Sequence, residues 1–162
     1  MYGDDLYLKG KGSLTKRLAQ HFLIDTVVLQ NILLAADLDN NDTVVEIGPG
    51  KGILTQQLVT LAGKVIAIEI DSRLASSLKD RLKRPKNLQV VESDARTVTF
   101  DELFRDVKNY KLVANLPYYA AIPIIRRFLE YRDLKPDRIV CMVQKEVAST
   151  MTAAPGNRTV LS

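Results

Sequence analysis

Short apolar runs alternate along the chain with longer segments in which apolar residues recur every three or four positions. Buried strands produce the first pattern and helices with one buried face produce the second. The apolar runs predict five strands, at residues 44–47, 64–70, 88–92, 111–115 and 137–144. Because strands and helices alternate regularly, we expect an α/β fold with a parallel sheet and helices on both of its faces.

The helices between these strands are predicted from capping residues and from apolar periodicity. Asp25 can cap the first helix, and Asp71 or Ser72 can cap the helix after the second strand. Pro123 is tolerated in the first turn of a helix predicted over residues 122–131. Further helices are predicted from Ile53 onward, over 101–107 and over 146–151. The buried positions predicted for the first two helices are Val28, Leu29, Ile32, Leu33, Ala36, Ile53, Leu54, Leu58 and Leu61.

The chain length and composition indicate one globular domain. A chain of 162 residues can bury a core, and 46% apolar with 26% charged residues is typical of folded proteins. Residues 1–15 show little periodicity, and we expect a flexible basic lead there, followed by a single domain over 16–162. Residues 159–162 resemble a strand that has only just begun, so we expect the sequence to be part of a longer protein.

The residue counts also exclude several kinds of site and partner. His21 and Cys141 are the only residues of their types, so we expect no metal site and no disulfide framework. A lone cysteine suits the reducing cytoplasm, where we expect the protein to act, and a small buried residue is the simplest role for Cys141. No apolar run approaches the length of a membrane span, so we expect no membrane partner.

Basic residues are concentrated in two segments of the chain. The net charge of +4 and pI near 9.2 are modest by themselves. The two clusters comprise Lys9, Lys11, Lys16 and Arg17, and then Lys79, Arg81, Lys83, Arg84 and Lys86. Each cluster fits either a solvated surface or a nucleic-acid contact, and charge alone leaves both open.

Acidic and amide side chains stand where the first four predicted strands end. These residues are Glu46, Glu69, Asp94 and Asn115. Ligands bind at the carboxyl ends of parallel strands. Glu69 follows the first glycine of the turn at the spacing from which an acid reaches both hydroxyls of a ribose. Asp94 is placed to accept a hydrogen bond from the amine of an adenine, although either acid could instead be a solvated strand end or a helix cap.

Three glycines at alternate positions follow the first strand. Gly48, Gly50 and Gly52 allow a sharp turn and close approach of a ligand. The dinucleotide fingerprint requires G-x-G-x-x-G, whereas the third glycine here comes one residue early. The pattern from Glu46 to Gly52 resembles the first motif of Rossmann-like methyltransferases that bind S-adenosylmethionine. The acidic surroundings suit that cationic ligand better than NAD, whose pyrophosphate needs hydrogen-bond donors.

The tetrapeptide Asn115-Leu116-Pro117-Tyr118 follows the fourth strand and suggests the acceptor. An aromatic amine is a poor nucleophile because its lone pair is delocalised into the ring. The Asn115 oxygen and a carbonyl near Leu116 can accept the amine hydrogens, which favours a pyramidal nitrogen. Pro117 stiffens the turn, and the ring of Tyr118 offers a face on which an extruded base can stack.

Six segments together resemble the ribosomal RNA adenine dimethyltransferases, a family that includes small-subunit dimethyladenosine transferases and macrolide-resistance methylases. The segments are Gln20–Leu23, residues 46–55 (EIGPGKGILT), residues 68–71 (IEID), Asp94-Ala95, residues 115–119 (NLPYY) and Gln144–Val147. The resemblance implies that His21 and Leu23 lie over S-adenosylmethionine and that Gly48 contacts its methionine part. It also implies that Glu69 contacts the ribose and that Asp94 contacts the adenine. Asn115 would contact both the target amine and the cofactor.

The expected function is therefore transfer of methyl groups to adenosine amines of ribosomal RNA by a monomer, with the small-subunit RNA as substrate. Ala19 replaces a usual glycine, and Ala120 with Ala121 replaces a common serine or threonine, which would leave room for a second methyl group. The resemblance also implies a final antiparallel strand pair and a helical RNA-binding domain, both missing after Ser162. A large-subunit methylase and a non-catalytic RNA-binding factor stay open as alternatives.

Overall fold

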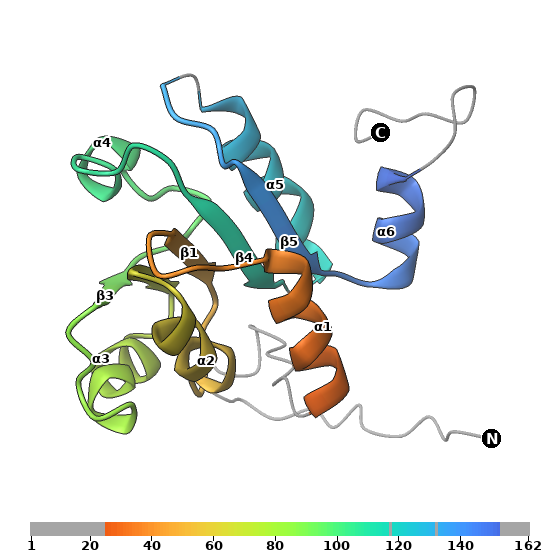
Figure 1. The fold of residues 1–162 in the computed structure, drawn as a ribbon. Helices are drawn as coiled ribbons and strands as arrows, with labels where there is room; N and C mark the ends of the chain where they lie inside the picture. The colour runs from red at the N-terminus through yellow and green to blue at the C-terminus, as the bar shows by residue number, and fades with distance from the viewer. Residues whose placement is uncertain (1–24, 117, 132, 153–162) are drawn as a thin grey trace, which may run out of the picture.

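The computed structural model describes residues 25–116, 118–131 and 133–152, and this part of the chain forms one parallel sheet covered by helices (Figure 1). The strands are β1 (Thr43–Ile47), β2 (Lys64–Glu69), β3 (Leu88–Glu92), β4 (Lys111–Asn115) and β5 (Arg138–Met142). The helices are α1 (Thr26–Ala36), α2 (Ile53–Leu61), α3 (Ser72–Arg81), α4 (Phe100–Leu103), α5 (Tyr118–Glu130) and α6 (Lys145–Met151). None of the described helices is both long and apolar enough to cross a membrane.

The predicted elements are confirmed, with small shifts at their ends. β3 and β4 have the predicted bounds, and Asp25 and Asp71 cap α1 and α3 with their carboxylates. The largest differences are of four residues each: α4 ends at Leu103 instead of residue 107, and α5 begins at Tyr118 instead of residue 122. Pro123 therefore lies inside the helix and not in its first turn, so the helix forgoes the hydrogen bond that this position would donate.

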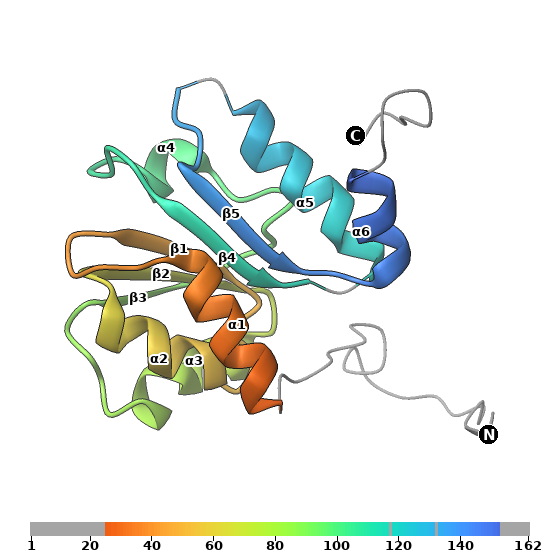
Figure 2. The same cartoon turned by 45° about the vertical axis from the view of Figure 1, so that its right-hand side comes forward.

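Helices cover both faces of the sheet, as the sequence predicts. Figure 2 shows α1, α2 and α3 on one side and α4 and α5 on the other. Alternate strand residues supply the two cores, so Val44 packs with α1, α2 and α3 whereas Val45 packs with α4 and α5. In α2, Leu54 and Leu58 are buried as expected.

Two expectations about burial are wrong. Ile53 and Leu61 are 37% and 40% exposed, so only the central part of the apolar stripe of α2 faces the core. Cys141 is half-buried, because β5 is an edge strand of the sheet in the described part of the chain. Partial burial still raises the pKa of the Cys141 thiol to about 12, which keeps it protonated and unreactive at neutral pH.

The strand order β3-β2-β1-β4-β5 places β1 next to β4, although three helices and two strands separate them in sequence. The chain winds outward in one direction from β1 to β3 and then returns to the other side of β1. A crevice opens at the carboxyl ends of the strands wherever the winding reverses in this way. The fold thus brings the glycine turn after β1 beside the tetrapeptide after β4.

The opposite edge of the sheet is tied to α1 by basic side chains. Lys111 of β4 donates to the Asp37 carbonyl and to the Asp42 carboxylate, at 2.8 Å from the latter. Arg138 of β5 donates to the Ala35 carbonyl at 2.8 Å. The last carbonyls of a helix have no partners within it, so these contacts satisfy the end of α1 and fix it on the sheet.

We predict that Lys111→Met lowers the free energy of unfolding by about 1–3 kcal/mol, because it leaves the largely buried Asp42 carboxylate without its cation. Burial raises the pKa of Asp42, but the hydrogen bonds from Lys111 and from the Asp39 N–H, together with the charges of Lys111 and Arg138, outweigh it, and the net shift is downward from 3.8. The stabilisation is therefore present above pH 3.8 and is lost as the pH falls below it. Urea unfolding at neutral and acidic pH measures both effects. The exposed Lys135→Met is the control, and an equal loss in both variants would contradict the prediction.

Candidate functional site

The turn between β1 and α2 has the backbone conformation that its glycines were expected to provide. Gly48, Gly50 and Gly52 have φ values of 69°, 58° and 86°, in the left-handed region that other residues rarely adopt. A Cβ on Gly52 would lie 2.7 Å from Cδ1 of Leu78 in α3, so this glycine also permits close packing of two helices. The predicted glycine turn is confirmed.

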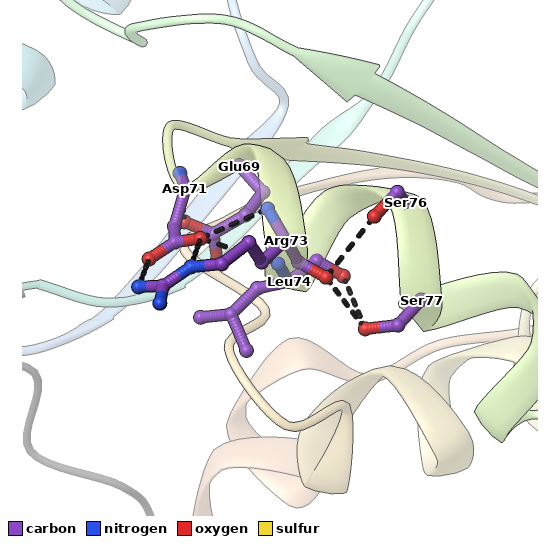
Figure 3. Close-up of polar contacts among 6 residues, drawn as sticks. All are labelled: Glu69, Asp71, Arg73, Leu74, Ser76 and Ser77. Carbon is purple, nitrogen blue, oxygen red and sulfur yellow. Dashed lines mark hydrogen bonds and ion pairs between the residues drawn. The ribbon is translucent and has the colours of Figure 1, made fainter.

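Glu69 ties this turn to the end of β2 and to the start of α3. One carboxylate oxygen accepts from the Gly50 N–H at 3.0 Å, and the other accepts from the Asp71 N–H at 3.0 Å. Asp71 in turn caps α3 and pairs with Arg73, as Figure 3 shows. Glu69 is only 1% exposed, so backbone donors supply most of the solvation of its charge. Each oxygen keeps a second lone pair, with which it could accept from a hydroxyl.

Gly48, Glu69 and Asn115 form a row across three adjacent strands. Ile47 is level with Ile68 of β2 and with Ala114 of β4, so the next residue of each strand lies at the same height. A Cβ placed on Gly48 would lie 3.9 Å from the Asn115 carbonyl oxygen, which confirms how closely the ends of β1 and β4 approach. The row crosses the position where the winding of the sheet reverses.

Glu46 lies in β1, two residues before Gly48, and is buried beside α2. It is 1% exposed, and its Oε2 atom has no hydrogen-bond partner among the described residues. Burial raises the pKa of Glu46 to about 8; the Thr55 hydroxyl offsets part of this rise, and the charge on Glu69 adds to it. At neutral pH the Glu46 carboxyl group is therefore largely protonated.

Asp94 follows β3 and forms a two-point ion pair with Arg96. Nε of Arg96 lies 3.0 Å from both carboxylate oxygens, and the Arg96 N–H donates to Oδ1 at 2.8 Å. The hydrogen bond from the Arg96 side chain lowers the pKa of Asp94 despite partial burial. A base amine would thus have to share this carboxylate with Arg96. Sequence reasoning missed that pairing, although a cation two residues after the acid was the available signal.

The tetrapeptide after β4 is partly described. Asn115 ends β4 level with Met142 of β5, and the Leu116 N–H donates to the Met142 carbonyl at 3.1 Å. The Leu116 side chain is buried, so only the backbone of this residue could contact a ligand at the site. Pro117 and the side chain of Tyr118 lie outside the described residues, as do His21 and Leu23, so their predicted roles stay predictions.

Three further residues directly follow the tetrapeptide. Tyr119 is 47% exposed, and its ring is therefore open to a ligand. Ala120 and Ala121 are 5% and 0% exposed and belong to the core beneath α5. Their small size serves helix packing, and the expectation that they leave room for a second methyl group stays a prediction.

We predict that Glu46→Gln makes the folded state more stable above about pH 5 and that the gain grows up to about pH 8. An unfolded glutamate releases its proton near pH 4.5, whereas the folded protein holds it up to about 8, so the stability of the parent falls across this window. Glutamine keeps the neutral form at every pH.

Denaturant unfolding at several pH values checks this prediction, with the exposed Glu102→Gln as control. Parallel pH profiles for the parent and Glu46→Gln would show that the buried carboxyl is already ionised in the folded protein.

Comparison with known proteins gives one family match. The family model described as ribosomal RNA adenine dimethylase matches residues 12–162. A relative from Dehalococcoides mccartyi strain ATCC BAA-2266, named ribosomal RNA small subunit methyltransferase A, is 47% identical over 147 residues. The match covers 91% of this chain and 50% of the relative, so the chain spans about half the length of the curated relatives it matches.

Solved structures agree with this match. A dimethyladenosine transferase from Plasmodium falciparum has a TM-score of 0.73 at 36% identity, covering 87% of this chain and 50% of that chain. The 23S rRNA methyltransferase ErmE has a TM-score of 0.71 at 31% identity, covering 82% of this chain and 51% of that chain. The fold is therefore the Rossmann-like methyltransferase fold that the sequence predicted. With its family model matched over most of its length, the chain belongs to the ribosomal RNA adenine dimethylase family.

Proposed function

We propose that the chain transfers methyl groups from S-adenosylmethionine to the exocyclic amine of adenosines in small-subunit ribosomal RNA. The observation that carries the proposal is the row of Gly48, Glu69 and Asn115 at the carboxyl ends of three adjacent strands. The row brings a glycine turn, a buried acid and an amide residue together at one edge of the sheet, which supports a single small-ligand site there. Relatives named small subunit methyltransferase support the choice of RNA.

The open backbone of the glycine turn and the acids beside it support S-adenosylmethionine as the donor. The turn has no Cβ atom at Gly48 or Gly50, so a ligand can approach its backbone. Glu69 and Asp94 are acidic, and Glu46 adds a carboxyl group that holds or releases a proton. S-adenosylmethionine would supply a methyl group made electrophilic by its sulfonium. Glu69 would hold the ribose, Gly48 the methionine part, Asp94 the adenine, and His21 and Leu23 would cover the ligand.

The acceptor side would work by holding the amine in position. Asn115 and the carbonyl near Leu116 would accept the amine hydrogens, which directs the nitrogen lone pair toward the donor. Such positioning lowers the barrier because the reacting groups lose no further freedom at the moment of reaction. Tyr118 would stack on the extruded base. No strong base is required, since a methylated amine becomes acidic and can release its proton to water.

The assay of the whole proposal is methylation of isolated small and large ribosomal subunits, with the products mapped by primer extension. Methylated adenosines confined to the small subunit are the expected result. Methylation of the large subunit alone would identify the second candidate, a large-subunit methylase, which the similarity to ErmE favours. S-adenosylmethionine binding without any transfer would favour a non-catalytic RNA-binding factor.

Calorimetry should show binding of S-adenosylmethionine and none of NAD.

We predict that Asn115→Ala lowers the rate of methyl transfer by about 10²-fold or more, because the amine loses its principal acceptor. Affinity for S-adenosylmethionine should fall only moderately, since Glu69 and the glycine turn stay in place. Single-turnover transfer and calorimetric titration separate the two effects. Asn109→Ala, which changes an exposed asparagine just before β4, is the matched control. Full turnover by Asn115→Ala would remove this residue from the mechanism.

We predict that Tyr118→Ala costs about 1–3 kcal/mol of transition-state stabilisation through lost stacking. Tyr119→Ala removes the neighbouring exposed ring and serves as the comparison. Rates with saturating donor and limiting RNA measure both variants. If only Tyr119→Ala slowed transfer, the stacking ring would be Tyr119, and the role assigned to Tyr118 would be wrong.

A further inference from the structure

A second charged surface lies where α3 ends and the chain turns into β3. We call it the basic turn; its members are Lys79, Arg81, Lys83, Arg84 and Lys86. All five side chains are exposed. Asp80 is the one acid among them, and it pairs with Arg84 at 2.6 Å. The other four cations form no ion pair in the part of the chain that the structure describes. This short segment thus has a net charge equal to the +4 of the whole chain.

The backbone of the basic turn is held in an unusual conformation. The Arg84 N–H donates to the Lys79 carbonyl at 2.7 Å, and the Lys83 N–H donates to the Asp80 carbonyl at 3.1 Å. This pair of bonds is the Schellman motif, which requires a left-handed residue after the helix end. Lys83 occupies that position with φ of 60°, and Arg84 follows with φ of 53°. Glycine is strongly preferred there, because a Cβ is strained in this region.

No local contact accounts for a lysine at this strained position. The Lys83 side chain makes no hydrogen bond or ion pair in the described structure. Cations near the end of a helix stabilise its dipole, but Lys79 and Arg81 already lie in the last turn of α3. A backbone outlier without local compensation indicates a functional constraint. The side chain of Lys83 is therefore a candidate for contact with a partner.

The chemistry of the basic turn favours a polyanion over an apolar surface. The leucines beside the cations face inward: Leu78 and Leu88 are 0% and 4% exposed, and Leu82 packs against the core. A membrane or hydrophobic protein surface would need exposed apolar side chains between the charges. The basic turn offers cations without apolar side chains between them. Proteins contact nucleic-acid phosphates through such lysine and arginine side chains.

The basic turn is also separate from the methyl-transfer site. It precedes β3, whereas Glu69 and Asp94 lie at the carboxyl ends of β2 and β3. Five residues of strand span about 16 Å at roughly 3.3 Å per residue, so the two surfaces lie at opposite edges of the sheet. A ligand at the basic turn must therefore be a part of the substrate remote from the methylated base.

We propose that the basic turn binds the phosphate backbone of RNA, at a segment distant from the target adenosine, and that Lys83 is held left-handed to contact it. The choice of RNA over other polyanions rests on the function proposed above. The contact would orient a large folded substrate without reading its sequence, because phosphates carry no base information.

Lys83→Gly is the informative variant, since glycine suits the left-handed position and removes only the charge. We expect its thermal stability to equal or exceed that of the parent. Its affinity for a labelled RNA hairpin, measured by fluorescence anisotropy, should fall about fivefold to eightfold at about 0.1 M salt. The slope of log affinity against log salt should fall by about 0.7–0.9, the value of one phosphate contact. Adding Lys79→Gln and Lys86→Gln should deepen both losses.

The control is the pair Lys108→Gln and Lys135→Gln, which removes two exposed lysines from other turns and should leave the salt slope unchanged. Equal RNA affinity and slope in Lys83→Gly and the parent would overturn the proposal. So would a loss confined to binding of phosphatidylserine vesicles, which would identify a lipid partner. These readouts need no catalysis, so absence of methyl transfer by the parent would reject the proposed function and leave this comparison readable.

Discussion

The two hydrogen bonds to the carboxylate of Glu69 are the interaction on which the site depends. They join the glycine turn after β1, through Gly50, to the start of α3, through Asp71. A buried charge must be solvated by donors, and the donors recorded in the described part of the chain are the backbone N–H groups of Gly50 and Asp71. The Glu69 carboxylate depends on the Gly50 N–H for solvation, and the same hydrogen bond holds the glycine turn in place. This mutual requirement explains why a loop with three left-handed glycines has one defined conformation.

Burying Glu46 near Glu69 has a cost that the site resolves by protonation. Burial removes the Glu46 carboxylate from water, and the nearby charge of Glu69 adds a smaller penalty, so burial chiefly raises the pKa of Glu46 and it keeps its proton to higher pH. A cation bound nearby would favour the ionised form and draw that proton off. Glu46 can therefore be neutral in the free protein and negatively charged around a cationic ligand.

One acidic cluster and one basic cluster lie at opposite edges of the sheet. Acids gather at the carboxyl ends of the strands, where backbone N–H groups and helix starts stabilise them, whereas the basic turn stands at the amino ends. A small cation and a large polyanion would thus be attracted to opposite edges of one sheet. The parallel arrangement makes this separation possible, because every strand runs from the one edge to the other.

The sequence by itself determined the elements and most of the chemistry. Apolar periodicity located the strands and helices, and the spacing of Gly48, Gly50 and Gly52 predicted a turn that the structure confirms. These features depend on neighbours in the chain, which is why a single sequence reveals them. The tertiary structure alone decided that β4 lies beside β1, which brings Asn115 to Gly48, and that Asp94 is already paired with Arg96. It also decided that Glu46 is protonated near neutral pH, because strand order and burial arise from packing between segments distant in the sequence.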